Sequence, residues 1–247
     1  MKPKHICIAI FFILFVTGSS FAGQWNTYTK NTSGLAGDTV RAICIDVNGV
    51  KWFGTADGLT RFDGADWTTY TTADSLAHDS VRDIDFEVTS HGPEIWVGTE
   101  GGVSVISVVP DAITFATPYR KDNTGLIDNG VNAAAVDSSH VKWFGTDFGV
   151  SSFNGGEWAQ YDINSLLTGN RVLSIAVDLD GWIYFGTDGA GITRFDGVTS
   201  ASPWDTDWTG LPSDAITAAY VAPDGIPGFA ADRRLQRHIG PRNNPNP

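Results

Sequence analysis

The sequence predicts an all-β protein, a β-propeller of four-stranded blades, and three observations lead to this prediction. An aromatic hexamer, "VKWFGT" at 141–146, has near-copies at 51–55, 95–99 and 183–187. The aromatic residue that leads each copy follows the previous one after 44, 47 and 41 residues, a period typical of a propeller blade. The chain is also rich in Trp, Phe, Gly and Asp, and only 18% of its residues are charged. That composition suits a compact all-β protein.

Two further features recur in phase with the hexamer. A leucine upstream of each copy is followed by Asp or Asn and then by Val or Ile, as in Leu35, Asp38 and Val40. The same pattern begins at Leu76, Leu126, Leu167 and Leu211. An aromatic turn phrase follows the hexamer, at 61–70, 152–161 and 194–197. Four complete repeats and a partial fifth therefore favour a propeller over a stacked β-solenoid, whose repeats are usually shorter.

The first repeat predicts four strands in order. Residues 39–46 are apolar on both faces, as an inner strand packed between neighbouring sheets requires. Asn-Gly within 47–49 suits a tight hairpin before the second strand, the hexamer itself. The third strand is expected at 59–63 and the outer strand at 67–71. The hexamer's aromatic residues should fill the space between blades, and its glycine should permit close backbone approach. These glycines are Gly54, Gly98, Gly145 and Gly186.

The repeats depart from their own pattern in several places. Repeat 2 has "VISVVPDAITF" at 105–115 in place of the aspartate-glycine turn, and repeat 4 has a stretched outer strand near Trp204 to Trp208. The segment "QWNTYT" at 24–29 matches an outer strand, which we expect to complete the last blade and close the ring. The fifth repeat supplies one recognisable strand, at 215–225.

Residues 226–247 form a basic tail rich in Pro and Asn, without a recognisable hexamer. One interpretation is a disordered extension. The interpretation we favour is a truncated or frame-shifted gene, because four repeats and one strand fit poorly with the usual four to eight blades. An incomplete ring would expose sheet edges, through which copies of the protein could associate.

The repeats resemble the two-component regulator propeller repeats over about residues 25–225. The resemblance rests on the Leu, Asp and Val motif, an "AI..D..G" strand, "WFGT" and "DGL.RFDG..W..Y". Such repeats occur in the extracytoplasmic sensor regions of bacterial hybrid histidine kinases and in some secreted bacterial proteins. The resemblance implies a propeller and a sensing or binding role outside the cytoplasm, with no catalytic mechanism.

The N-terminal segment has the layout of a signal peptide. Lys2 and Lys4 precede an apolar run from Ile6 to Val16, and Ala22 ends a stretch of small residues. An uncleaved anchor is the alternative, but the run is about half of the roughly 20 residues that a membrane span needs. We therefore expect residues 1–22 to be removed after Ala22, leaving the propeller repeats at 23–225 and a periplasmic or extracellular protein.

The expected mature chain is acidic and has no membrane span. It holds 14 basic and 28 acidic residues, a formal charge of −14, which argues against nucleic acid and anionic membranes as partners. It retains one cysteine, Cys44, so an internal disulfide is excluded.

A search for catalytic and metal-binding patterns finds none. The histidines at 78, 91, 140 and 238 lack metal-ligand spacing, and Cys44 lies in an expected core strand. The phrases "DVNG" at 46–49 and "DLDG" at 178–181 resemble the start of a calcium loop but lack its final glutamate, so turn chemistry is the favoured interpretation. No catalytic residue, metal or cofactor is therefore predicted. Most tryptophans fall at repeat positions, which favours structural roles over sugar stacking; Trp182, Trp204 and Trp208 do not.

One face of the propeller is the candidate binding surface. The loop that enters each inner strand and the loop between the second and third strands must emerge together, and propeller ligands often bind where such loops converge. The acidic members of this predicted site are Asp57, Glu100, Asp147 and Asp188. The other members are Arg41, Arg82, Asn132 and Arg171. For any one of these residues, a hairpin or solvated-surface role is the simpler alternative.

The sequence therefore predicts an exported, non-enzymatic ligand-binding module of the sensor type. The ligand class, an extracellular glycan or another small ligand, comes from the resemblance alone. Two alternatives remain open: a secreted or surface-attached structural or adhesive protein, and a propeller lyase or hydrolase acting on polysaccharide.

Overall fold

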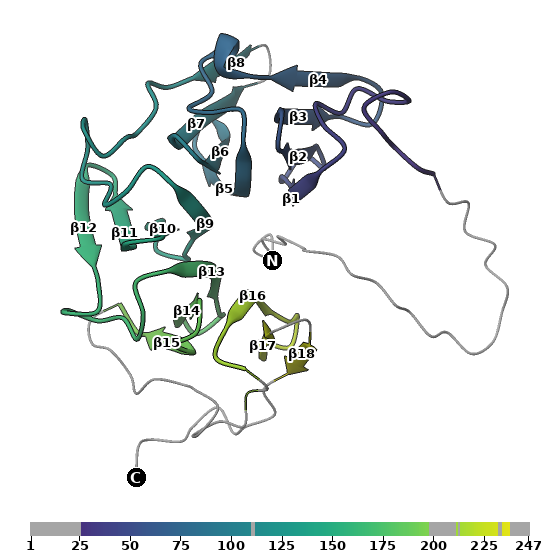
Figure 1. The fold of residues 1–247 in the computed structure, drawn as a ribbon. Coiled ribbons are helices and arrows are strands. Elements are labelled where there is room, and N and C mark those ends of the chain that lie inside the picture. The colour runs from purple at the N-terminus through teal and green to yellow at the C-terminus, as the bar shows by residue number, and fades with distance from the viewer. Residues whose placement is uncertain (1–25, 110–111, 198–210, 212, 232–233, 238–247) are drawn as a thin grey trace, which may run out of the picture.

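The strands of the computed structural model form five antiparallel sheets (Figure 1), which confirms the predicted propeller. The structure describes residues 26–109, 112–197, 211, 213–231 and 234–237. Each sheet follows the chain order of its strands, from an inner strand beside the central axis to an outer strand.

Three blades have four strands among the described residues. Blade 1 contains β1 (Val40–Ile45), β2 (Lys51–Thr55), β3 (Gly58–Phe62) and β4 (Trp67–Tyr70). Blade 2 contains β5 (Val81–Thr89), β6 (Gly92–Thr99), β7 (Gly102–Val109) and β8 (Ala112–Phe115). Blade 3 contains β9 (Val131–Val136), β10 (Lys142–Thr146), β11 (Gly149–Asn154) and β12 (Glu157–Tyr161). A short 3-10 helix, η1 (Thr72–Asp74), links blades 1 and 2.

Two blades have three strands among the described residues. Blade 4 contains β13 (Val172–Val177), β14 (Ile183–Thr187) and β15 (Ile192–Phe195). Blade 5 contains β16 (Ile216–Val221), β17 (Pro227–Ala231) and β18 (Arg234–Arg237). The predicted stretched outer strand near Trp204 to Trp208 lies outside the described residues.

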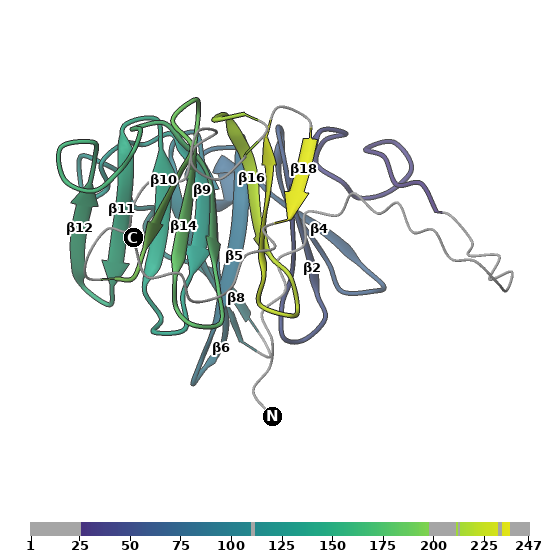
Figure 2. The same ribbon diagram turned by 90° about the horizontal axis from the view of Figure 1, so that it is seen from below.

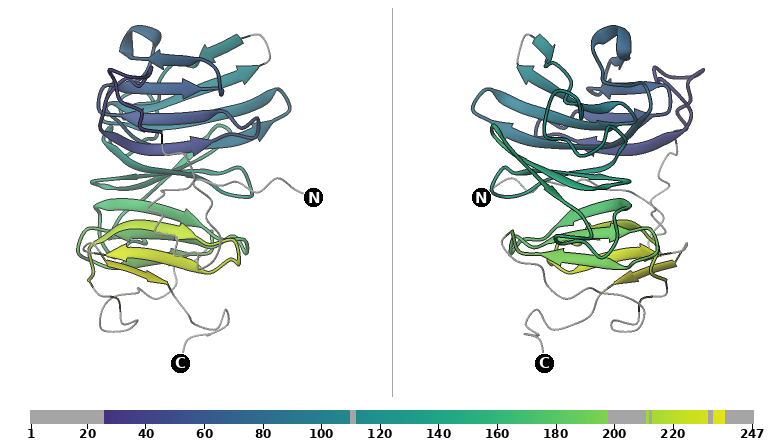
Figure 3. Two further views of the ribbon diagram at one scale, coloured as in Figure 1. Left: turned by 90° about the vertical axis from the view of Figure 1, so that its right-hand side faces the viewer. Right: turned by 60° about the vertical axis from the view of Figure 1, so that its left-hand side comes forward.

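The inner strands β1, β5, β9, β13 and β16 contact one another in that order. Within the described part of the chain, no comparable contact joins β16 back to β1, so the ring is open between blades 5 and 1 (Figure 3, left). Among the residues described between 26 and 237, no helix is long and apolar enough to cross a membrane.

The disc has two faces, which we name by what emerges there. The arginine face carries the starts of the inner strands and the loops between second and third strands. The hairpin face carries the turns between inner and second strands. Blade 2 is longer than its neighbours at the hairpin face, because β5 and β6 have nine and eight residues. Figure 2 shows their hairpin extending beyond the others.

The glycine of each hexamer marks the contact between neighbouring blades. A methyl group added at Gly145 would lie 2.6 Å from Cγ1 of Val172, the first residue of the next inner strand. Gly54 and Gly98 meet Val81 and Val131 in the same way, at 2.5 and 2.8 Å. The glycine of the hexamer and the valine of the upstream motif therefore form one interface, written in two successive repeats.

The aromatic residue of the hexamer is held by the aspartate of the preceding hairpin. Asp46 accepts a hydrogen bond from Nε1 of Trp52 at 3.1 Å, while its other oxygen accepts the backbone N–H groups of Asn48 and Val50. Asp178 uses the same arrangement with the hydroxyl of Tyr184, at 2.9 Å. The turn interpretation of "DVNG" and "DLDG" is thereby confirmed.

Aromatic rings of the hexamer pack against the phenylalanines of the following blade. Trp96 lies 6.0 Å from Phe144 between ring centroids, and Trp143 lies 5.8 Å from Phe185. Cys44 is fully buried in blade 1, as its strand position predicts. The core is therefore a series of interblade layers, one for each pair of neighbouring sheets.

The expectation that the repeat stops after residue 225 is wrong. Strands β17 and β18 continue blade 5 within the predicted tail. Phe229 takes the position of the hexamer's phenylalanine, but Gly228 replaces its tryptophan. The ring of Tyr220 lies over Gly228 instead, since a methyl group there would come within 2.3 Å of it. Strand β17 therefore lacks the "WFGT" pattern, and the aromatic ring beside it comes from β16.

The expectation of an outer strand at 24–29 is also corrected. Residues 26–29 are not in a strand, and Ser33 donates its backbone N–H to the carbonyl of Thr29 at 2.9 Å, which turns the chain. The ring of Tyr28 lies 5.3 Å from that of Trp67, so this segment contacts blade 1. Residues 24–25, like the predicted signal peptide at 1–22, lie outside the described part of the chain.

Replacing Gly145 by alanine should destabilise the protein by about 1–3 kcal/mol, because the added methyl group overpacks the contact with Val172. Chemical denaturation followed by tryptophan fluorescence measures this. The exposed Ala159→Val variant is the control and should change stability by no more than about 0.5 kcal/mol. Equal stability of wild type and the glycine variant would contradict the proposed interface.

Candidate functional site

A continuous chain of polar side chains crosses the arginine face, beginning between blades 1 and 2. Nη1 of Arg41 donates to Oγ of Ser80 at 2.6 Å and lies 3.9 Å from Oε1 of Glu100. Nη2 of Arg82 donates to that same Oε1 at 3.1 Å. Glu100 therefore joins an arginine from each of two neighbouring inner strands.

The chain continues from blade 2 to blade 4. Nη1 of Arg82 donates to Oδ1 of Asn132, whose Nδ2 donates to Oδ1 of Asp147 at 2.8 Å. Nε of Arg171 donates to that aspartate oxygen at 3.1 Å, and its Nη1 donates to Oδ2 of Asp188 at 2.5 Å. Seven of the eight predicted site residues thus form one network. Its links from Arg41 to Glu100, from Arg82 to Asn132 and from Arg171 to Asp147 join neighbouring blades.

Asp57 is the predicted residue that the structure places apart from this network. It forms an ion pair with Lys30 at 3.6 Å. Glu100 directly follows the threonine that ends its second strand, whereas Ala56 occupies that position in blade 1 and Asp57 comes one residue later. The sequence signal was therefore available, as a shift of one residue in phase.

Two carboxylates of the network, Glu100 and Asp147, have lowered pKa values. Hydrogen bonds from Arg82 and Ser80 hold the pKa of Glu100 below its usual value. The pKa of Asp147 is lowered by its hydrogen bond from Asn132 and by Arg171. The side chains remain accessible: 56% of the Arg171 surface and 44% of the Asp147 surface are exposed. The surface can therefore offer fixed donors and acceptors to a polar ligand.

Two acidic residues on β5 were not predicted as part of any site. Oδ2 of Asp83 accepts the backbone N–H of Ala134 at 2.9 Å, and Oδ2 of Asp85 accepts that of Val136 at 2.7 Å. The two carboxylates thus bond to the edge of β9, the next inner strand. Burial raises the pKa of Asp83 to about 7, against the lowering effect of its backbone donors. The signal was "DID" at 83–85, where blade 1 has "AIC".

Further along β5, Glu87 forms a buried ion pair with Nζ of Lys142 at 2.6 Å. His140 approaches the other oxygen of Glu87 at 3.1 Å. Burial, together with the charge of Glu87, raises the pKa of Glu94 on the neighbouring strand. Glu87 occupies the position that Asp46 and Asp178 have in their blades, but it bonds to Lys142 and not to the aromatic residue of the hexamer. Nε1 of Trp96 is therefore buried without a hydrogen-bond partner among the described residues.

The tryptophan outside the repeat phase that the structure describes is Trp182. The guanidinium of Arg194 stacks on its ring at 3.4 Å, so its face packs within blade 4. Trp204 and Trp208 lie outside the described residues. Across those described residues, no group of three or more His, Cys, Asp or Glu side chains could hold a metal ion.

Comparison of the sequence with protein-family models and with curated proteins finds no match. Solved structures do match. One, described as the extracellular domain of a hybrid two component system, BT3049 from B. thetaiotaomicron, is 24% identical with a TM-score of 0.66. The match covers 83% of this chain and 27% of that one, so the chain spans about a quarter of that domain. Extracellular domains of two component systems are the class of protein to which the repeats show a resemblance in sequence.

Two other neighbours have different roles. PorZ, a bacterial surface component of the type-IX secretion system of Porphyromonas gingivalis, is 18% identical with a TM-score of 0.62, over 90% of this chain and 35% of PorZ. Virginiamycin B lyase from Staphylococcus aureus is 14% identical with a TM-score of 0.57, over 82% of this chain and 70% of the lyase. At these identities the matches establish the propeller fold, which regulators, surface proteins and enzymes share.

The raised pKa of Asp83 predicts a specific pH dependence of stability. Its folded pKa of about 7 exceeds the ordinary value of 3.8, so the folded state holds the proton more tightly than the unfolded state. Its contribution to the unfolding free energy must therefore fall as pH rises from about 4 to about 7 and stay level above that.

Urea denaturation at several pH values tests this prediction on wild type and Asp83→Asn. The stability of wild type relative to the variant should fall across that pH window. The exposed Asp180→Asn variant controls for the loss of one carboxylate. A difference between wild type and Asp83→Asn that does not vary with pH would refute the assignment.

Proposed function

We propose that the protein is an exported, non-enzymatic recognition propeller that binds a polar, polyhydroxylated ligand such as a glycan on its arginine face. The observation that carries this proposal is the network of Arg41, Glu100, Arg82, Asn132, Asp147, Arg171 and Asp188. Four blades contribute to it, so a ligand above the network could contact several loops at once.

The chemistry of the network favours binding. Its arginines are already fixed by carboxylates, so a ligand would order few side chains on arrival and binding would cost little conformational entropy. Hydroxyl groups can donate to the ionised carboxylates and accept from the remaining guanidinium N–H groups.

The same chemistry argues against proton-transfer catalysis at this face. A general acid or base works best with a pKa near the working pH. The pKa values of Glu100 and Asp147 are lowered instead, which keeps both side chains ionised. An enzymatic role at another part of this protein's surface is the alternative, because the structural neighbours include a lyase.

Support for export and sensing comes from two directions. Residues 1–22 have the layout of a signal peptide. The structural neighbours include extracellular domains of two component systems. The sensor role and the cleavage after Ala22 belong to the proposal.

A second candidate role, assembly of copies through the open side of the ring, has its own observation. Trp67 stacks with Phe62 and Phe53 at centroid distances of 4.3 and 5.6 Å. The equivalent residues of blade 3 are packed against Trp96 of the preceding blade. In blade 1 this aromatic side faces the opening of the ring, where another copy could cover it.

A panel of neutral and acidic oligosaccharides, screened on an array and measured by titration calorimetry, tests the proposed binding. We expect Asp188→Ala and Arg82→Ala each to weaken binding of the best oligosaccharide about tenfold, because each removes a fixed polar group. Asp180→Ala removes an aspartate of the same blade from the hairpin face and should bind as wild type does. If Arg41→Ala and Arg82→Ala leave every affinity unchanged, the arginine face is not the site.

A further inference from the structure

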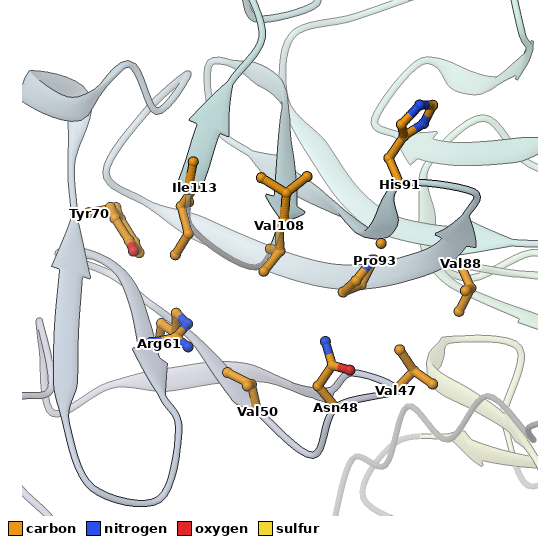
Figure 4. A pocket seen from close by; sticks show the side chains of 13 residues that line it. Val47, Asn48, Val50, Arg61, Tyr70, Val88, His91, Pro93, Val108 and Ile113 are labelled. Carbon is orange, nitrogen blue, oxygen red and sulfur yellow. The ribbon is translucent and has the colours of Figure 1, made fainter.

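A groove of about 960 Å³ opens at the hairpin face between blades 1 and 2, on the opposite side of the disc from the arginine network. Its walls are mostly apolar and include Val50, Pro93, Val108 and Ile113 (Figure 4). The volume is within the range usual for small-molecule sites.

The groove exists because blade 2 departs from the repeat. The long β5–β6 hairpin supplies Val88 and Pro93, and strands β7 and β8 supply Val108 and Ile113. These are the two segments in which repeat 2 lacks the ordinary turn phrases. The longer strands thus raise one apolar wall above the shorter hairpin of blade 1, which forms the other.

Arg61 on β3 supplies a cationic group to this apolar space. Its Nη1 donates to Oδ2 of Asp63 at 3.0 Å, but its Nε is buried and has no hydrogen-bond partner in the described chain. At the equivalent position of blade 4, the guanidinium of Arg194 is stacked on Trp182. Figure 4 shows Arg61, Asn48 and Tyr70 around the same space as the apolar side chains.

Asp63 pairs with Arg61 through one oxygen and with the backbone through the other. The backbone N–H groups of Asp66 and Ala65 donate to Oδ1 of Asp63 at 2.9 and 3.0 Å, and with Arg61 they lower its pKa to about 2. Among the described residues that line the groove there is no carboxylate, and Arg61 and His91 are the ones that can carry charge. On a chain of formal charge −12, a groove that is lined by an arginine and by no carboxylate favours an anion.

From this geometry we infer a second ligand site, for a small amphiphile that combines a carboxylate with an apolar chain. The carboxylate pairs with the Arg61 guanidinium and accepts a hydrogen bond from the amide of Asn48. The apolar chain lies along Val108, Pro93 and Val50, where its surface is removed from water. This site shares no residue with the arginine face and does not depend on the function proposed for it.

Titration calorimetry with octanoate tests the inference directly. Octanoate should bind the full chain, whereas octanamide, which lacks the charge, and acetate, which lacks the chain, should each bind at least tenfold more weakly. Arg61→Gln should lose at least tenfold in octanoate affinity. Arg41→Ala, on the other face, should bind octanoate as wild type does.

A second variant guards against loss of folding in Arg61→Gln. Ala112→Asp adds a carboxylate at the exposed rim of the groove and should weaken octanoate binding by repulsion, with an unchanged circular dichroism spectrum. Absence of octanoate binding to wild type would overturn the inference. Equal affinity for octanoate and octanamide, or an unaffected Ala112→Asp variant, would overturn it as well.

Discussion

The close contact between the hexamer's glycine and the first residue of the next inner strand is the constraint on which the rest of the structure depends. It brings each sheet so near to its neighbour that no side chain larger than hydrogen fits, as Gly145 and Val172 show. This approach lets Trp143 reach Phe185 across the boundary. It also brings the starts of successive inner strands close enough for their side chains to bond across the arginine face.

The repeat then assigns most of its residues to structural tasks. The hairpin aspartate holds the turn and the aromatic ring, and the threonine of the hexamer closes the following loop, as Thr146 does by donating to the carbonyl of Gly149 at 2.9 Å. The residues that differ between repeats are the ones available for function. The arginine network and the groove beside blade 2 are separate features, because they occupy opposite faces of the disc.

The fold could be predicted from the sequence because its signals repeat in phase. Glycine, tryptophan and aspartate each appear at the same point of several repeats, and each has one physical task there. Blade 5 was predicted only in its first strand, since its second strand has Gly228 where the other blades have an aromatic residue, and the ring of Tyr220 lies over that glycine. Compensation between two strands cannot be recognised by comparing one strand with its counterparts.

The residues of the candidate site could be predicted from the sequence better than the hydrogen bonds and ion pairs between them. Loop position alone brought seven residues to one face, but their order depends on side-chain reach. Arg171 precedes the valine of its repeat where Arg82 follows it, and still bonds to two aspartates, whereas Asp57, shifted by one residue, bonds elsewhere. The groove could not be predicted, because one of its walls comes from the long β5–β6 hairpin and from strands β7 and β8 of blade 2, which share no pattern with the other blades.

Hydrogen exchange, measured with and without the oligosaccharide that binds best, tests whether the arginine face is the binding surface. We predict slower exchange in the loops at 99–102 and 146–149 of that face, where the network joins the blades. Protection confined to the hairpin face, or no protection at a saturating concentration, would contradict it.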